Sequence, residues 1–113
     1  MKLDKGLVSG STTLLILNLL QNEDMYGYQM IENLERRSNN VFTLKAGTLY
    51  PLLHALEQQS IIKSYDVEES NRTRKYYSLT DIGNKVLDKK KAEWVTYTKA
   101  VNDVLGGLQY ATV

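Results

Sequence analysis

Hydrophobic residues in the first half of the chain recur with helical spacing. Residues 3–20 predict a first helix whose second half is apolar on nearly all sides, so we expect it to be buried all round. Tyr28, Ile31 and Leu34 then recur every three residues and predict a short second helix that ends near Ser38.

The third predicted helix has the most regular pattern. Its inward stripe has the spacing i, i+3, i+4 and i+7 and consists of Leu49, Leu52, Leu53 and Leu56. Pro51 lies past the first turn of this pattern, where proline removes a backbone donor, so we expect the helix either to begin later or to bend there. The opposite side and its flanks carry Thr48, Tyr50 and His54.

Two β-strands are expected after this helix, at residues 61–67 and 73–79, because both stretches alternate and are rich in Ile, Val and Tyr. Residues 68–72 between them are polar and turn-like, which predicts a hairpin with a mobile tip. Thr80 is then suited to an N-cap, with Asp81 in the first turn of a long final helix.

The final helix carries a narrow apolar seam with heptad spacing, interrupted by Lys90. Such a seam is poorly suited to water and predicts a partner, most simply a second copy in a two-fold dimer. The seam residues expected at the dimer interface are Leu87, Trp94, Tyr97, Val101, Val104 and Leu108.

The order of these elements predicts a mainly α fold of the α+β class. We expect a winged helix-turn-helix over residues 1–79 and a dimerisation helix over residues 80–113, in one compact domain of 113 residues. In such a fold the third helix enters the DNA major groove, and the hairpin is the wing.

The formal charge is only +1, so binding to double-stranded DNA would rest on locally placed cations. Three of them fall within four residues of the hairpin, which favours phosphate contact, although a solvated hairpin tip explains the same cluster. The expected DNA contacts are Lys45, Thr48, Tyr50, His54, Arg72, Arg74 and Lys75. The near-neutral charge keeps open an alternative, a winged-helix adaptor that binds proteins without DNA.

Other classes of protein find little support. Cysteine is absent, a single histidine makes a zinc site improbable, and no nucleophile has a base beside it, so we expect no enzyme, metal or cofactor. Residues 7–20 are apolar but interrupted by Ser and Thr, and they are shorter than the roughly 20 residues that span a bilayer. A cytoplasmic protein without membrane contact is therefore expected.

Three runs in this order and spacing are typical of one family. They are residues 26–30 (YGYQM), residues 47–51 (GTLYP) followed by Leu56-Glu57, and residues 74–80 (RKYYSLT) with Gly83. With them, residues 7–94 resemble the PadR family of bacterial transcriptional regulators, and the length resembles the short branch that includes multidrug-sensing repressors. The resemblance implies a homodimer that represses a promoter at a palindromic operator and is released by an effector.

The resemblance also implies a site for that effector. Trp94 matches the tryptophan that, paired across the dimer, sandwiches planar aromatic compounds in the short members, and Leu14, Leu17 and Asn18 face the same region by analogy. A tryptophan on a heptad seam fits a plain dimer-core aromatic equally. Lys90 and the adjacent Lys91 leave open an anionic effector, or none.

Overall fold

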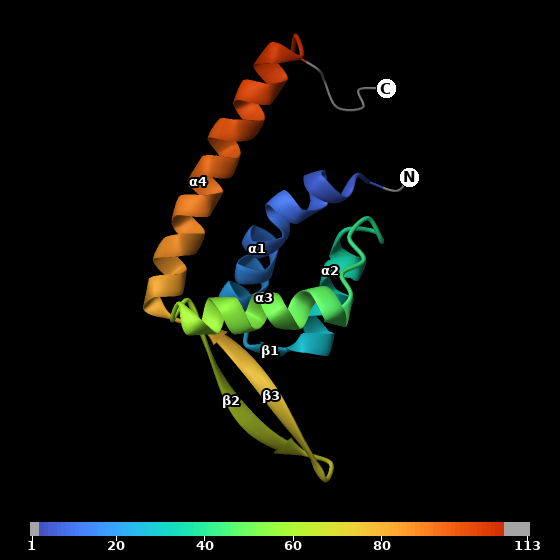
Figure 1. The fold of residues 1–113 in the computed structure, drawn as a ribbon, viewed down its shortest axis with the longest axis vertical. Helices are drawn as coiled ribbons and strands as arrows, with labels where there is room; N and C mark the ends of the chain where they lie inside the picture. Colours follow the sequence, from blue (N-terminus) through green and yellow to red (C-terminus); the bar gives the residue numbers. More distant parts are fainter. Residues whose placement is uncertain (1–2, 108–113) are drawn as a thin grey trace.

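A computed structural model describes residues 3–107 as an α+β winged helix-turn-helix followed by a long C-terminal helix (Figure 1). The helices are α1 (Lys5–Asn22), α2 (Gly27–Arg37), α3 (Ala46–Gln58) and α4 (Asp81–Val104). The strands are β1 (Met25–Tyr26), β2 (Ile62–Glu69) and β3 (Arg72–Leu79), which form an antiparallel sheet in the order β1-β3-β2. The predicted fold class is confirmed.

The core lies where α1, α2, α3 and the base of the sheet meet. Its fully buried side chains are Ile16, Leu17, Met30, Leu49, Leu53, Ile62, Tyr77 and Leu87. Only the second half of α1 takes part, because the buried residues of this helix begin at Ser11. The expectation that the apolar half of this helix is buried holds for Ile16 to Leu20, with Asn18 as the half-buried exception.

The helix predicted around Tyr28 exists as α2, but its inward face differs from the prediction. Gly27, Met30 and Leu34 are buried, whereas Tyr28 is 65% exposed. The two-residue strand β1 that precedes α2 was not expected, because two residues are too few to show an alternating pattern. It pairs with β3 and joins the start of α2 to the hairpin.

Pro51 does not delay the start of α3, so a later beginning of this helix is wrong. The helix begins at Ala46 and continues past Pro51 to Gln58. Proline has no N–H for the Gly47 carbonyl four residues earlier, but both residues lie on the exposed side of α3. Water can therefore hydrate this carbonyl, which explains how the proline is tolerated.

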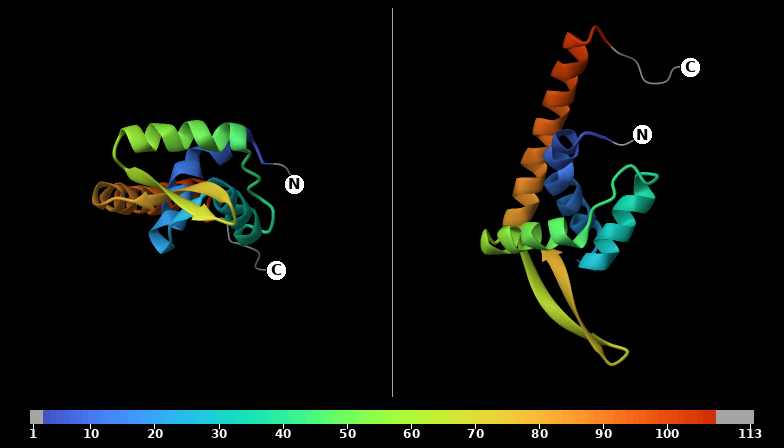
Figure 2. Two further views of the ribbon diagram at one scale, coloured as in Figure 1. Left: turned by 90° about the horizontal axis from the view of Figure 1, so that it is seen from below. Right: turned by 45° about the vertical axis from the view of Figure 1, so that its right-hand side comes forward.

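The hairpin is longer and its turn tighter than predicted. Its strands pair from Ile62 opposite Leu79 to Glu69 opposite Arg72, which leaves only Ser70 and Asn71 in the turn. Both turn residues have positive φ, 48° and 63°, as expected for a type I′ turn that matches the twist of the strands. The wing therefore extends as a regular two-stranded arm away from the helices (Figure 2).

The start of α4 follows the prediction closely. The Thr80 side chain accepts a hydrogen bond of 2.9 Å from the Gly83 N–H, which is a regular N-cap. From there α4 packs its first turns beside α1 and then projects beyond the helical body, at the end opposite the wing (Figure 1). The molecule thus carries its two extended elements at opposite ends.

Candidate nucleic-acid interface

The wing, the start of α2 and the middle of α3 together line an open hollow, here called the wing–α3 hollow. The side chains that define it are Tyr28, Tyr50, His54, Arg72, Arg74 and Lys75. Five of the seven predicted DNA contacts therefore lie together, although they come from two elements far apart in sequence. Aromatic, imidazole and cationic groups on one concave surface suit contact with base edges and phosphates.

Tyr50 reaches this hollow from α3 and is held by the neighbouring helix. Its hydroxyl end packs against Gly27 at the start of α2, so closely that a Cβ at position 27 would collide with it and lie 2.7 Å from Tyr50 Cζ. The ring is nevertheless 39% exposed. The N-terminus of α2 thus fixes an aromatic side chain that remains accessible on the face of α3.

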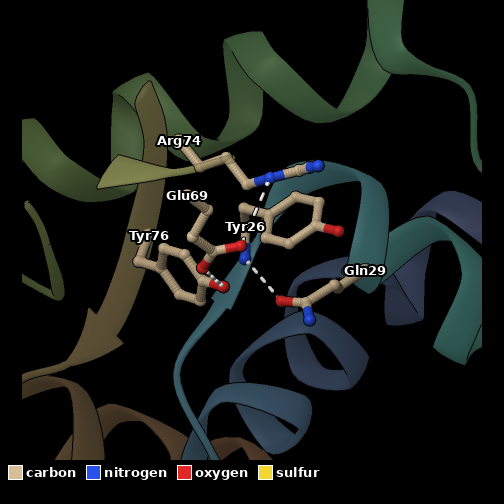
Figure 3. Close-up of polar contacts among 5 residues, drawn as sticks. All are labelled: Tyr26, Gln29, Glu69, Arg74 and Tyr76. Carbon is tan, nitrogen blue, oxygen red and sulfur yellow. Dashed lines mark hydrogen bonds and ion pairs between the residues drawn. The ribbon is translucent and has the colours of Figure 1, made fainter. Parts of the chain in front are cut away.

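Arg74 is not the free surface cation that the sequence suggested. Its Nε lies 3.5 Å from Glu69 Oε2, and its guanidinium carbon lies 4.5 Å from the centre of the Tyr26 ring (Figure 3). The 3.5 Å separation makes the Glu69 contact an ion pair, without the geometry of a good hydrogen bond. Arg74, one member of the predicted cation cluster, therefore already has two partners in the protein before DNA binds.

Glu69 is itself held by a second partner. The Tyr76 hydroxyl donates a hydrogen bond of 2.7 Å to Glu69 Oε1. This bond to a carboxylate stabilises the neutral phenol and raises the pKa of Tyr76 to about 12. Tyr76 also stacks on Tyr65, and Tyr26 meets it edge to face with ring centres 5.4 Å apart. Each tyrosine therefore helps to fix the wing relative to β1.

The other two cations of the predicted cluster, Arg72 and Lys75, are exposed, and each faces an acid across the hairpin. The strand register places Arg72 opposite Glu69 and Lys75 opposite Asp66. Because side chains alternate along a strand, Lys75 lies on the face of the sheet that also carries the buried Tyr77, and Arg72 lies on the other face. The wing therefore offers cations on both faces, and both belong to the wing–α3 hollow because it is lined by the consecutive residues 72–75 of β3.

Lys45 and Thr48 do not join the wing–α3 hollow. They line a different depression, between the first half of α1 and the segment that precedes α3, together with Lys5 and Phe42. Lys45 is the N-cap residue of α3, and its carbonyl accepts the N–H groups of Thr48 and Leu49. These two predicted contacts are exposed at the tip of α3, apart from the other five.

A groove of about 420 Å³ between α1 and α4 brings together some of the expected effector residues. Leu14, Lys90, Trp94 and Tyr97 line it. Leu17 is fully buried in the core and has no surface for a ligand, so its expected place in the site is wrong. Asn18 is half-buried and lies outside the groove lining.

The apolar seam of α4 is exposed over its second half. Trp94 is 42% and Val104 is 87% exposed, and the Trp94 and Tyr97 rings lie 6.2 Å apart. Leu87 shares the heptad spacing but is fully buried in the core of its own chain, so it has no surface to offer a second copy and is corrected to a core residue. Leu108, also predicted for the seam, lies outside the described residues.

Sequence reasoning missed three residues of this region. Tyr26 was noted only as part of a motif, Tyr28 was expected on the inward face of its helix, and Glu69 fell within the polar stretch expected to form the turn. The two-residue turn is the signal that could have found Glu69, because it fixes the register that puts Glu69 directly opposite Arg72 and diagonal to Arg74.

Residues 3–107 contain no group of three or more histidine, cysteine or acidic residues arranged to hold a metal ion. None of the helices within this range combines the length and apolar character that crossing a membrane requires.

Comparisons with known proteins agree with this geometry. Residues 16–89 match the transcriptional regulator PadR-like family. A transcriptional regulator of Clostridium thermocellum has a similar structure, with 32% identity and a TM-score of 0.82 over 88% of this chain and 97% of that one. A PadR family transcription regulator of Clostridium difficile R20291 is 37% identical, with a TM-score of 0.74 over 84% of this chain and 98% of that one.

A curated relative extends the comparison to a longer protein. The transcriptional regulator YqjI of Escherichia coli is 30% identical over 84 residues, which is 74% of this chain but only 39% of YqjI. The family match covers the helix-turn-helix, the wing and the start of α4, which are the elements that build the wing–α3 hollow. The chain belongs to the PadR-like family of transcriptional regulators.

Proposed function

We propose that the chain is a sequence-specific DNA-binding regulator whose α3 enters the major groove while the wing holds the phosphate backbone. The observation that carries this proposal is the wing–α3 hollow, where Tyr50 and His54 of α3 share one concave surface with Arg72 and Lys75 of β3. Tyr50 and His54 would approach base edges, and Lys45 and Thr48 at the tip of α3 would extend the contact to nearby bases and phosphates.

The proposed active form is a homodimer joined through α4. The exposed seam residues Trp94, Tyr97, Val101 and Val104 are apolar and consecutive in heptad spacing, which suits packing against the same helix of a second copy. Two copies related by a two-fold axis would present two α3 helices to a palindromic operator, with half-sites about 34–36 Å apart. The part of the chain from residue 80 would then serve chiefly for dimerisation.

The proposal includes repression that a small effector relieves. The groove of about 420 Å³ between α1 and α4 lies within the size range of ligand sites, roughly 300–1,000 Å³. Trp94 and Leu14 suit a planar aromatic compound, and Lys90 and Glu93 put one charge of each sign on the groove wall, so neither sign of ligand charge is favoured. The effector must bind the DNA-released form more tightly than the DNA-bound form, because otherwise it shifts no equilibrium.

Titration of the protein onto the duplex upstream of its gene, at two salt concentrations, tests the DNA-binding proposal. We expect tighter binding to this duplex than to a scrambled one, and a loss of affinity as salt rises. Binding to neither duplex, even at about 50 mM salt, would contradict the proposal and favour a winged-helix adaptor that binds proteins. A regulator of this kind acts where the chromosome is, so the proposal places it in the cytoplasm.

The effector is tested separately, through the sole tryptophan of the chain. A panel of planar aromatic acids and cations should quench Trp94 fluorescence with saturation, and the compounds that do so should release the duplex. No saturable response from any compound would count against an aromatic effector at this groove.

A further inference from the structure

The direction of the Arg74 side chain carries a further conclusion. Glu69 engages only the Nε atom, and the two terminal nitrogens extend past the Tyr26 ring, away from the carboxylate (Figure 3). Arg74 and Tyr26 both line the wing–α3 hollow. The part of the guanidinium that can grip a phosphate with two parallel hydrogen bonds is therefore left available at the hollow.

Both residues that hold Arg74 are themselves held. Glu69 accepts the Tyr76 hydroxyl at 2.7 Å, and the Tyr76 ring stacks on Tyr65 across the hairpin. The Tyr26 backbone N–H donates a hydrogen bond of 3.1 Å to Gln29 Oε1 in the first turn of α2. The support of Arg74 thus runs through the wing on one side and the N-terminus of α2 on the other.

We propose that Glu69 and Tyr26 are positioning residues that present the terminal nitrogens of Arg74 to a DNA phosphate, an inference that rests on the proposed DNA-binding function. A free arginine loses rotamer freedom when it binds, and that loss weakens binding. Because Glu69 and Tyr26 already order the side chain before DNA arrives, less freedom is lost on contact. Because Tyr26 immediately precedes α2, the phosphate contact of the wing also depends on the start of that helix.

An acid beside a phosphate-binding arginine could instead compete with DNA for the cation. The two roles, positioning and competition, predict opposite changes in DNA affinity when the acid is removed. If Glu69 competes, its removal tightens DNA binding. If it positions Arg74, its removal weakens binding, even though a negative charge near the DNA has gone.

The chain offers a matched control for that lost charge. Glu68 is the neighbouring acid on the opposite face of β2, where its carboxylate accepts the Thr73 hydroxyl at 2.8 Å. Glu68→Gln therefore removes one wing charge without touching the support of Arg74. Any difference between Glu68→Gln and Glu69→Gln reports on positioning rather than on net charge.

The experiment measures the affinity of wild type, Glu68→Gln and Glu69→Gln for the upstream duplex and for a scrambled duplex of equal length. We expect Glu68→Gln to bind as well as wild type or better. Glu69→Gln should bind about 2- to 10-fold more weakly, the cost of ordering one long side chain. Because the contact is with a phosphate, the loss should be equal on both duplexes.

A double-mutant cycle shows whether Glu69 acts through Arg74. In an Arg74→Ala background, Glu69→Gln should no longer weaken binding. Tyr26→Phe, which keeps the ring under the guanidinium, should retain affinity, whereas Tyr26→Leu should lose it. Thermal unfolding of Glu69→Gln should stay close to wild type, because glutamine keeps a side-chain oxygen that can accept the Tyr76 hydroxyl and the half-buried ion pair with Arg74 is long, at 3.5 Å.

Three results would overturn the inference. Glu69→Gln could tighten binding as much as Glu68→Gln does, it could weaken binding equally without Arg74, or it could leave affinity unchanged. Failure of the wild-type protein to bind either duplex would instead overturn the proposed function itself, so the two failures are distinguishable.

Discussion

The Tyr50 hydroxyl rests against Gly27, and this contact joins the face of α3 to the first residue of α2. The absence of a side chain at position 27 is what allows the approach. Gly27→Ala should therefore displace the Tyr50 ring while leaving the fold intact, because the atoms in the way are the far end of a half-exposed side chain.

We expect Gly27→Ala to weaken DNA binding while thermal stability stays within about 1 kcal/mol of wild type, since alanine also favours the helix by that order. Fluorescence anisotropy and thermal unfolding measure the two effects. The Gly27→Ala/Tyr50→Ala double variant should bind no more weakly than Tyr50→Ala alone. If Gly27→Ala binds DNA with unchanged affinity, Tyr50 does not depend on its contact with Gly27 to act in DNA binding.

Gly83 is expected to respond differently, because backbone rather than a flexible side chain fills the space beside it. A Cβ at position 83 would collide with the Ile61 carbonyl oxygen and lie 2.7 Å from Leu79 Cδ1. Gly83→Ala should destabilise the protein by about 1–3 kcal/mol, as overpacking does. Gly47→Ala is the matched helical control with open space at its Cβ, and urea unfolding should show no loss for it.

The α4 seam can be tested by placing one charge in it. Val101→Asp would bury a carboxylate between two helices, so the variant should sediment as single chains and bind the operator at least about 10-fold more weakly. Thr96→Asp adds the same charge outside the heptad seam and should leave the wild-type sedimentation unchanged. Equal behaviour of the two variants would argue against this seam as the interface.

Tyr76 gives the wing a pH dependence. Its folded-state pKa of about 12 lies above the ordinary value of 10.0, because its hydroxyl donates to Glu69. The folded protein therefore holds this proton more tightly than the unfolded chain, so the stability from this hydrogen bond is present below pH 10 and lost as the pH rises toward 12.

Urea unfolding at about pH 9 and about pH 11 should show a smaller drop in stability for Tyr76→Phe than for wild type. Burial of Tyr77 raises its pKa as well, so wild type and variant share that part of the pH dependence and only their difference reports on Tyr76. An identical drop in both proteins would show that the Glu69 bond does not raise the pKa of Tyr76.

Local patterns predicted the elements that depend on local chemistry. The Thr80 cap and the leucine stripe of α3 follow from neighbouring residues alone, and both are present. Leu87 shows the limit of such patterns. It shares the heptad spacing of Trp94, yet it is fully buried in the core of its own chain while Trp94 is 42% exposed, and spacing alone does not report which neighbours a helix meets.

The residue types of the candidate site could be predicted from the sequence, but the contacts between them could not. The cations of β3 are visible in the sequence, whereas the engagement of Arg74 depends on a strand register and on a two-residue strand that carries Tyr26. Leu17 was likewise expected at a ligand groove by analogy with the family that the sequence resembles. Only the packing of α1 shows that this side chain lies inside the core.

Hydroxyl-radical footprinting on the duplex upstream of the gene tests most directly whether two copies present their wing–α3 hollows to one DNA. A dimer that does so should give two protected half-sites on one face, with centres about one helical turn or 34–36 Å apart, and weaker protection for Arg72→Ala. A single protected half-site at saturating protein, or none at all, would contradict it.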